Sequence, residues 1–492
     1  MRILMLDIDT LRPDHMSCYG YQRQTTPNID KIADAGVRMD EYYCSDAPCL
    51  PARASLVSGR FGIHHGAVGH GGTAADRRLT GCERDFRDIQ DQENFHNLFR
   101  KAGLYTASIS TFAERHSSFW FNAGFNEMHN VGKGGLESGE EVLPEALRWL
   151  DREQDREDWF LHVHLWDPHT PYRAPESFGN PFADEPLPEW LCQPGVLEAH
   201  VKNVGPHSAQ EINMFDDTES PQYPRHPGKV TDQDGLRRII DGYDCGIRYA
   251  DELIGQIFSK LQAQGIFDEV AIIITSDHGE NFGELGLYGE HATADYTTCR
   301  IPMIIRWPGA QENHVDSDFH YHIDLVPTMA DLLGLPHAAL WDGQSYAKTI
   351  QEGTAAGRPY LVLSQMAHVC QRSVRFDEWL YMRTYHDGLN LFPDEMLFNV
   401  KDDPHEQYDL TQSHPEKCGQ AARLLDAWHA GMMETSGSAI DPLWTVMNEG
   451  GPYHPRGHLK SYIERLEHTG RSEGAARLRE KYKHELDSSP EK

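Results

Sequence analysis

The stretch VAIIITSDHGE, residues 270–280, changes abruptly from a run of apolar residues to a polar loop. A short apolar run rich in β-branched residues is typical of a strand that is buried on both faces, as strands of parallel sheets are. A long segment with helical periodicity, residues 235–264, comes just before it. This alternation of helices and buried strands predicts an α/β fold with a doubly wound, mostly parallel sheet flanked by helices.

Segments on both sides of this stretch fit the same plan. Strands are expected at 3–8, 37–43, 104–110, 159–165 and 300–309, and helices at about 28–35 and 143–154. From about residue 350 the pattern changes to shorter strands, at 360–365 and 379–384, and a helix near 415–433. We therefore expect an α/β domain over 1–350 with a long irregular insertion at 173–232, a smaller α+β subdomain over 351–450, and a charged helical tail over 451–492 that is a surface element or an oligomer contact.

The composition excludes several classes of protein. The chain of 492 residues has 45 basic and 76 acidic residues and a net charge of −31, which argues against general binding of nucleic acid or of anionic membranes. No segment approaches the roughly 18 apolar residues of a membrane span. Residues 1–10 lack the features of a signal peptide, so we expect a cytoplasmic protein, or a periplasmic or secreted one if a signal was removed.

The nine cysteines do not form a recognisable framework. Their number is odd, their spacing is scattered, and no CxxC pair occurs. This argues against both a disulfide-stabilised fold and a structural zinc site. Most of them are expected to be buried as small hydrophobic residues.

Four polar clusters follow predicted strands, where the ligands of doubly wound sheets bind. They are DIDT at 7–10, CLPAR at 49–53, DPH at 167–169 and SDHG at 276–279. Carboxylates at the ends of two strands, with a histidine beside one of them, favour a site for a divalent cation.

The CLPAR segment lies where a helix is expected to begin, near Pro51. Cys49 would then be at the helix N-terminus, where free N–H groups favour an anion and lower the pKa of a thiol. Arg53 is one turn further on and could bind a tetrahedral oxyanion with its planar guanidinium. The same residues would also fit an ordinary capped helix with a buried cysteine and a surface arginine.

CLPAR followed by ASLVSGR resembles the Cys-x-Pro-x-Arg motif of the formylglycine-dependent sulfatases, a family of the alkaline phosphatase superfamily. Other resembling segments occur in the expected order over about residues 1–410: IDTLRPDHMSCYG, TTPNIDKIADAGVRMDEYY, DPHTPY, SDHGENFGELGLYGEH, RIPMIIRWPG, DLVPTMADLLG and MLFNVKDDPHEQYDL. The resemblance implies an alkaline-phosphatase-like fold. It also implies that a formylglycine-generating maturation enzyme oxidises Cys49 to Cα-formylglycine.

The resemblance further implies a mechanism. One hydroxyl of the hydrated aldehyde at position 49, activated by the metal, attacks the sulfur of a sulfate ester and forms a covalent sulfo-enzyme. The second hydroxyl then loses its proton, and collapse to the aldehyde expels sulfate.

The resemblance implies one divalent cation, Ca²⁺ first and Mn²⁺ as the alternative. Thr10 stands where the family usually has a second acid, and His278 stands where many members have Asn, which is why a softer ion is conceivable. Asp7 could compensate for the missing acid, although a buried acid hydrogen-bonded to backbone is the preferred interpretation. The expected metal ligands are Asp9, Thr10, Cys49, Asp277 and His278.

Cys49, Arg53, His169 and His291 are the expected catalytic residues. His169, in DPHTPY, resembles the family's histidine next to the sulfate, which acts as a general acid or binds the sulfate; the alternative is a loop histidine held by two prolines. His291 would replace a lysine that the family often carries and could be cationic near an anion.

Several residues are candidates for substrate contact. The family's Gly-Lys-Trp-His element is absent, and Arg115 or His116 could replace its basic residues. In FGIHHGAVGHGG, residues 61–72, His70 is the first candidate and His64 or His65 the next. Surface histidines in a glycine-rich loop are the alternative.

The expected function is hydrolysis of a sulfate ester on a carbohydrate, such as a glycosaminoglycan-type saccharide. A phosphonate monoester hydrolase or phosphodiesterase of the same superfamily is the alternative enzyme. A non-catalytic acidic binding protein on the same scaffold is the alternative outside enzymology. A homo-oligomer stays open, and no nucleic acid or membrane partner is expected.

Overall fold

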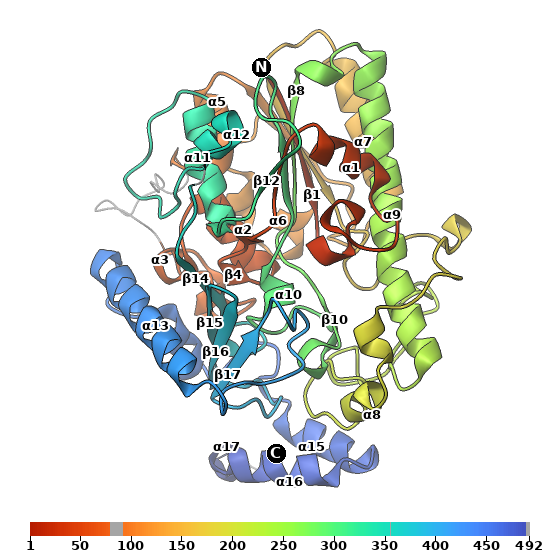
Figure 1. Cartoon of the computed structure of the whole chain (residues 1–492), viewed down its shortest axis with the longest axis vertical. Helices are drawn as coiled ribbons and strands as arrows, with labels where there is room; N and C mark the ends of the chain where they lie inside the picture. The colour runs from red at the N-terminus through yellow and green to blue at the C-terminus, as the bar shows by residue number, and fades with distance from the viewer. Residues whose placement is uncertain (79–91, 355, 489–492) are drawn as a thin grey trace.

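The computed structural model describes residues 1–78, 92–354 and 356–488 and is built around an eight-stranded sheet (Figure 1). The strand order is β12-β2-β11-β8-β1-β7-β5-β6. The strands are β1 (Arg2–Ile8), β2 (Val37–Met39), β5 (Tyr105–Ile109), β6 (Glu127–His129), β7 (Trp159–Leu165), β8 (Val270–Thr275), β11 (Met303–Arg306) and β12 (His314–Asp316).

Most neighbouring strands of this sheet are parallel, which confirms the predicted fold class. β1 runs parallel to both β7 and β8. β11 is the exception, because it pairs antiparallel with β8 and with β2. An antiparallel neighbour needs no crossover helix, and the chain between β8 and β11 contains only short elements. These are β9 (Asn281–Phe282), the 3₁₀ helix η8 (Glu284–Gly286), β10 (Tyr288–Glu290) and α10 (Tyr296–Cys299).

Helices cover both faces of the sheet (Figure 1). One face carries α1 (Pro27–Asp34), α7 (Gly139–Arg152) and α9 (Gln233–Ala263). The other carries α2 (Cys49–Ser58), α5 (Phe95–Lys101), α11 (Leu325–Leu332) and α12 (Ala347–Glu352).

Alternate residues of β1 point into these two layers. Leu4, Leu6 and Ile8 pack in the core beneath α9. Ile3 and Met5 pack in the core beneath α2. Because strand side chains alternate with a period of two, the next odd-numbered side chains are directed toward α2.

The predicted strand at 37–43 is divided in two. β2 belongs to the large sheet, whereas β3 (Tyr42–Tyr43) pairs with β13 (His320–Tyr321) in a separate two-stranded sheet. Two further short helices are α3 (Gly62–His65), which follows α2, and α6 (Phe112–Arg115), which follows β5.

A second sheet forms the smaller C-terminal subdomain, as predicted. It consists of β17 (Glu395–Asn399), β16 (Trp379–His386), β15 (Cys370–Phe376), β14 (Tyr360–Gln365) and β4 (Asp46–Ala47), in that order. The helix α13 (Pro415–Thr435) packs on it through Cys418, Ala421 and Leu425. β4 comes from the start of the chain and pairs with β14, so the residues just before Cys49 are held by this sheet.

The insertion at 173–232 contains one α-helix, α8 (Val196–His200), and otherwise consists of loops and 3₁₀ turns in the described structure. The helices α14 (Pro442–Asn448), α15 (Leu459–His468), α16 (Ser472–Lys481) and α17 (Lys483–Ser488) form the end of the chain. The tail is tied to the insertion because the Arg471 guanidinium binds both carboxylate oxygens of Glu211, at 2.7 and 2.6 Å. In the described part of the chain, no helix combines the length and apolarity that a membrane crossing requires.

Candidate active site

Cys49 is the first residue of α2, and its side chain is buried. Its Sγ atom lies 3.0 Å from Nε2 of His278, which follows β8. Burial, reinforced by the nearby Asp9 carboxylate, raises the pKa of the Cys49 thiol to about 12. The expectation of a lowered thiol pKa is therefore wrong, because desolvation outweighs the helix N-terminus here.

Arg53 is buried among three carboxylates, so the interpretation as a surface arginine is wrong. Its side chain is 2% exposed, Nη2 donates to Oδ2 of Asp9 at 2.9 Å, and Nε lies 3.3 Å from Oδ2 of Asp277. Nη1 binds Asp7. Asp7 and Asp9 reach Arg53 because both side chains point from β1 toward α2.

Asp7 is held by side chains and not by backbone, which corrects the preferred interpretation of this residue. Besides Arg53, its carboxylate accepts a hydrogen bond from Nε2 of His162 at 3.2 Å. Burial disfavours the charged form, but Arg53 and the neighbouring histidines outweigh it and keep the pKa of Asp7 below its usual range.

The charge of this cluster fits a divalent cation. Three buried carboxylates surround one guanidinium, and burial, with Asp9 and Asp7 nearby, raises the pKa of Asp277 to about 8. Among the described residues, Oδ1 of Asp9 and Oδ2 of Asp277 are buried without a hydrogen-bond partner. A cation at these oxygens would compensate the remaining negative charge.

The donor atoms for such a cation lie close together. Ligand atoms of Asp9, Cys49, Asp277 and His278 are all within 4.8 Å of one another. The Thr10 hydroxyl donates to the carbonyl of Asp9 at 2.8 Å. Thr10 adopts a φ of +56°, and its N–H donates to Oδ1 of Asp277 at 3.3 Å, so its backbone helps to position that carboxylate.

Two expected catalytic histidines flank the cluster. Nε2 of His169 lies 4.0 Å from Oδ1 of Asp9. The His291 ring is centred 4.0 Å from the His278 ring, and its Nε2 lies 2.8 Å from Oε1 of Glu290. Burial alone would lower the pKa of His291, but the Glu290 carboxylate outweighs it and holds this pKa well above its usual value. Ligand atoms of His291, Cys49 and His278 all lie within 4.8 Å of one another.

A comparison with known proteins identifies the family. Residues 3–335 match the family model described as Sulfatase. The chain belongs to the sulfatase family. It is accordingly a sulfuric ester hydrolase within the alkaline phosphatase superfamily.

Three relatives illustrate the range of this sulfatase's similarities. An uncharacterized sulfatase of Escherichia coli, YidJ, is 26% identical over 430 residues, covering 83% of this chain and 82% of the relative. A solved structure in complex with its substrate D-glucosamine-2-N,6-O-disulfate has a TM-score of 0.67 and 20% identity, covering 88% of this chain and 98% of that one. A phosphonate monoester hydrolase of Agrobacterium radiobacter has a TM-score of 0.66 and 19% identity, covering 88% and 96%. The two structures show that the sulfatase shares their fold.

The expected substrate contacts fall into two groups in this sulfatase. The rings of His70 and His116 are centred 5.2 Å apart, and the Arg115 guanidinium lies 5.1 Å from the ring centre of Trp166. His65 instead supports α2, because its Nε2 lies 2.8 Å from Oγ of Ser55 and its Nδ1 accepts from the N–H of Ala67 at 3.2 Å. His64 also has a supporting place, with Nδ1 2.7 Å from a carboxylate oxygen of Asp342.

Sequence reasoning missed several histidines near the site. Nε2 of His164 lies 3.1 Å from Oδ2 of Asp9 and 2.8 Å from Nη2 of Arg53. The signal was present in WFLHVHL, where two polar residues alternate within a buried strand. Their meaning depends on the pairing of β7 with β1, which places His164 opposite Asp7. The other histidines near the site that were not predicted are His162, His207, His368 and His454.

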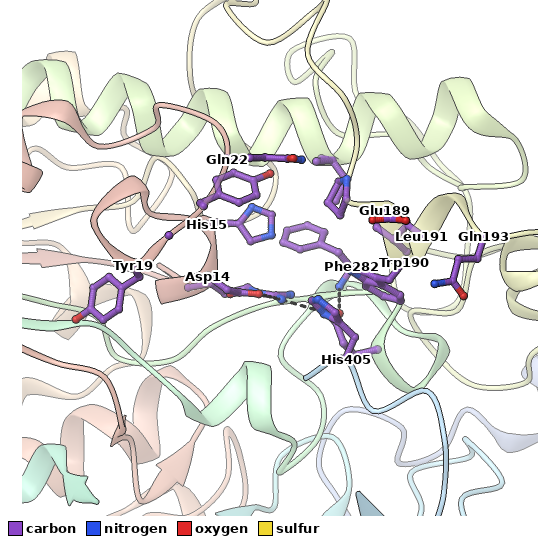
Figure 2. Close-up of a pocket in the computed structure, with 16 residues that line it drawn as sticks. Asp14, His15, Tyr19, Gln22, Glu189, Trp190, Leu191, Gln193, Phe282 and His405 are labelled. Carbon is purple, nitrogen blue, oxygen red and sulfur yellow. Dashed lines mark hydrogen bonds and ion pairs between the residues drawn. The ribbon is translucent and has the colours of Figure 1, made fainter. Parts of the chain in front are cut away.

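A separate pocket of about 580 Å³ is lined by side chains that include His15, Phe282 and Trp190 (Figure 2). Trp190 and His405 stack in its wall with ring centres 4.3 Å apart. Arg12, also in the wall, donates to the carbonyl of Glu280 at 2.7 Å and to Oε1 of Glu284 at 2.9 Å. Arg12 thus braces the loop after β8 from the side of this pocket.

Proposed function

We propose that this sulfatase hydrolyses a sulfate ester on a saccharide, with residue 49 as the nucleophile after its oxidation to Cα-formylglycine. The observation that carries the proposal is the convergence of Cys49, Asp9, Asp277 and His278 at the start of α2. These residues come from the N-terminal strand, the Cys-x-Pro-x-Arg helix and the loop after β8. The proposal includes a formylglycine-generating enzyme as the partner in maturation.

A divalent cation held by Asp9, Asp277 and His278, together with residue 49, belongs to the same proposal. The carboxylate oxygens favour Ca²⁺, whereas the imidazole of His278 also suits Mn²⁺. When bound, the ion would supply Lewis-acid activation of oxygen at position 49 or on the sulfate. Oδ1 of Asp9 and Oδ2 of Asp277 support this assignment, because both are buried and neither accepts a hydrogen bond from a described residue.

The surrounding residues would bind the sulfate and move protons. His291 lies beside His278 and in its protonated form would attract the anionic ester. Nδ1 of His169 donates to the carbonyl of Thr170 at 2.5 Å, and its Nε2 lies 4.0 Å from Oδ1 of Asp9. Nε2 of the neutral ring would accept a hydrogen bond at the site, and only the imidazolium form would protonate the leaving oxygen. Arg53 keeps Asp7, Asp9 and Asp277 together.

The saccharide part of the proposal has two supports. A solved structure of the same fold holds a doubly sulfated glucosamine as its substrate. The insertion and the C-terminal region also bring polar side chains to the site. Nε2 of His207, from the insertion, lies 3.4 Å from Oε2 of Glu290, and Nε2 of His368, from the C-terminal region, lies 3.9 Å from Oε1 of Glu290. Such polar walls suit a hydroxyl-rich substrate better than a flat aryl group.

The test is a side-by-side panel of sulfated mono- and disaccharides, an aryl sulfate, a phosphodiester and a phosphonate monoester. We expect the largest kcat/KM on a sulfated saccharide. The structural likeness to a phosphonate monoester hydrolase makes that activity the competing outcome. If phosphonate or phosphodiester turnover exceeds sulfate-ester turnover by orders of magnitude, the saccharide sulfatase proposal is wrong.

A further inference from the structure

Three histidines from distant parts of the chain meet beside the active site. His70 follows α3, His368 lies between β14 and β15, and His454 follows α14. Nδ1 of His70 lies 2.9 Å from Nε2 of His454, and the rings of His368 and His454 stack with centres 4.0 Å apart. One ring nitrogen from each residue lies within 4.8 Å of the other two.

Contacts outside the imidazole rings hold these segments in place. The N–H of His454 donates to the carbonyl of Ala367 at 3.1 Å, and the N–H of His368 donates to the side-chain oxygen of Gln365 at 3.1 Å. A Cβ atom at Gly71 would lie 2.2 Å from the ring of Tyr453, so glycine lets this ring pack directly against the loop. The fold therefore brings the three rings together through its backbone.

The chemistry of the cluster suits a borderline metal ion. Burial lowers the pKa of His454 to about 4 and, with help from neighbouring imidazoles, holds those of His70 and His368 well below their usual value. Neutral imidazole is the form that coordinates metals. Nε2 of His70 is buried without a hydrogen-bond partner among the described residues. Three imidazole nitrogens are a donor set for Zn²⁺ or Co²⁺ and a poor one for Ca²⁺.

We propose that His70, His368 and His454 bind a second metal ion of the Zn²⁺ class, distinct from the cation at Asp9, Asp277 and His278. Zn–N bonds of about 2.0–2.1 Å in a tetrahedron place the nitrogens about 3.3 Å apart, which rotation of the rings can reach from the present arrangement. Three protein ligands leave a fourth coordination position for water or for an anionic group of a substrate.

This ion would add positive charge to the site. Nε2 of His368 lies 3.9 Å from Oε1 of Glu290, and the same oxygen lies 2.8 Å from Nε2 of His291. An ion on His368 would thus be separated from His291 by one carboxylate. It would also link the glycine-rich loop to the C-terminal region. The evidence for the metal site at His70, His368 and His454 consists of these contacts, and the site does not depend on the proposed sulfate-ester chemistry.

The experiment loads the full-length protein with saturating Ca²⁺ and then titrates Zn²⁺, with bound metal measured by elemental analysis. We expect one zinc per chain to bind in the presence of Ca²⁺. His368→Gln and His454→Gln should each weaken zinc binding by at least about tenfold. Asp277→Asn and the exposed control His337→Gln should retain it. Co²⁺ in place of Zn²⁺ should give the visible absorption of a four-coordinate ion, lost in His454→Gln.

Two results would overturn the site. One is zinc binding that is unchanged in His454→Gln, and the other is zinc binding that Asp277→Asn abolishes, which would mean that zinc had displaced the first cation. Circular dichroism checks that each variant is folded. If the variants do not fold, zinc-edge anomalous scattering from crystals of the unmodified chain decides the question by locating the ion. Failure of this site would leave turnover of sulfated saccharides intact and separately measurable.

Discussion

The thiol sulfur of Cys49 lies 3.0 Å from Nε2 of His278, although the two residues are 229 positions apart. One begins a helix and the other follows a strand of the central sheet. Both are buried, at 2% and 0% exposure. A cation held by His278 and its neighbour Asp277 would therefore meet residue 49 directly, so the chemistry at position 49 and the occupancy of the cation site should depend on each other.

Cys49→Ala should abolish sulfate-ester turnover, by at least about three orders of magnitude, because it removes the nucleophile. Its melting temperature should stay near that of the parent protein, since the change removes only one sulfur atom from the start of α2. Mass spectrometry of the parent protein, coexpressed with a formylglycine-generating enzyme, should show the peptide containing residue 49 lighter by about 18 Da than the cysteine form. Cys49→Ser is the matched control: it keeps a hydroxyl but cannot form the hydrate, and should also be inactive. Near-full activity of either variant would refute the nucleophile assignment.

Arg53→Met should lower the free energy of unfolding by about 3–5 kcal/mol, because it leaves Asp7, Asp9 and Asp277 buried without their counter-ion. Urea denaturation measures this change. Arg53→Lys keeps the positive charge and should cost less. Added Ca²⁺ should reduce the difference between Arg53→Met and the parent protein, since the ion supplies charge to two of the same carboxylates, Asp9 and Asp277. An equal loss in both variants, unaffected by Ca²⁺, would contradict this account of Arg53.

The sequence was sufficient to predict the longer elements and where their polar ends lie. Strand β7 occurs at the predicted residues, and α2 begins close to the predicted position, because apolar periodicity and local breakers are properties of short segments. The pairing of Arg53 with Asp7 could not be predicted in the same way. It depends on which face of β1 packs against α2, and this is decided by the order of strands in the sheet.

Contacts between distant segments were the least predictable part of the site. His70 and His454 are 384 positions apart, and no local pattern connects them. The addition of β4 to the second sheet is a similar case, since a two-residue strand has no periodicity. The predicted lowering of the Cys49 thiol pKa is wrong because the sequence indicates the helix N-terminus but not how deeply the residue is buried.

Glu284→Gln should remove a pH-dependent part of the stability. Burial alone would raise the pKa of Glu284, but the Arg12 guanidinium and His405 outweigh it and lower this pKa to about 2. A depressed carboxyl pKa stabilises the folded state above the unfolded value of about 4.5, and this contribution disappears as the pH falls toward 2. The parent protein should therefore exceed Glu284→Gln by about 3 kcal/mol at pH 7, with a smaller difference at pH 3.5.

Urea denaturation at a series of pH values measures the effect of Glu284. Glu269→Gln is the matched control, because the Glu269 side chain, which pairs with Arg2, is 68% exposed. This control should change stability little at any pH. A pH-independent difference between Glu284→Gln and the parent protein would contradict the assigned shift.

Arg471→Met should weaken the attachment of the C-terminal tail to the insertion. Glu211 is fully buried and is bound by Arg471 through both carboxylate oxygens and by the hydroxyl of Tyr462 at 2.7 Å. Loss of the guanidinium removes two charge-assisted hydrogen bonds but leaves Arg465, whose Nε lies 3.1 Å from Oε2 of Glu211, as a counter-ion. The free energy of unfolding should therefore fall by about 2–3 kcal/mol. Arg479→Met is the control, because Arg479 and its partner Glu467 are 48% and 40% exposed, and should cost less than about 1 kcal/mol. Equal effects of the two variants in urea denaturation would show that the tail does not brace the insertion.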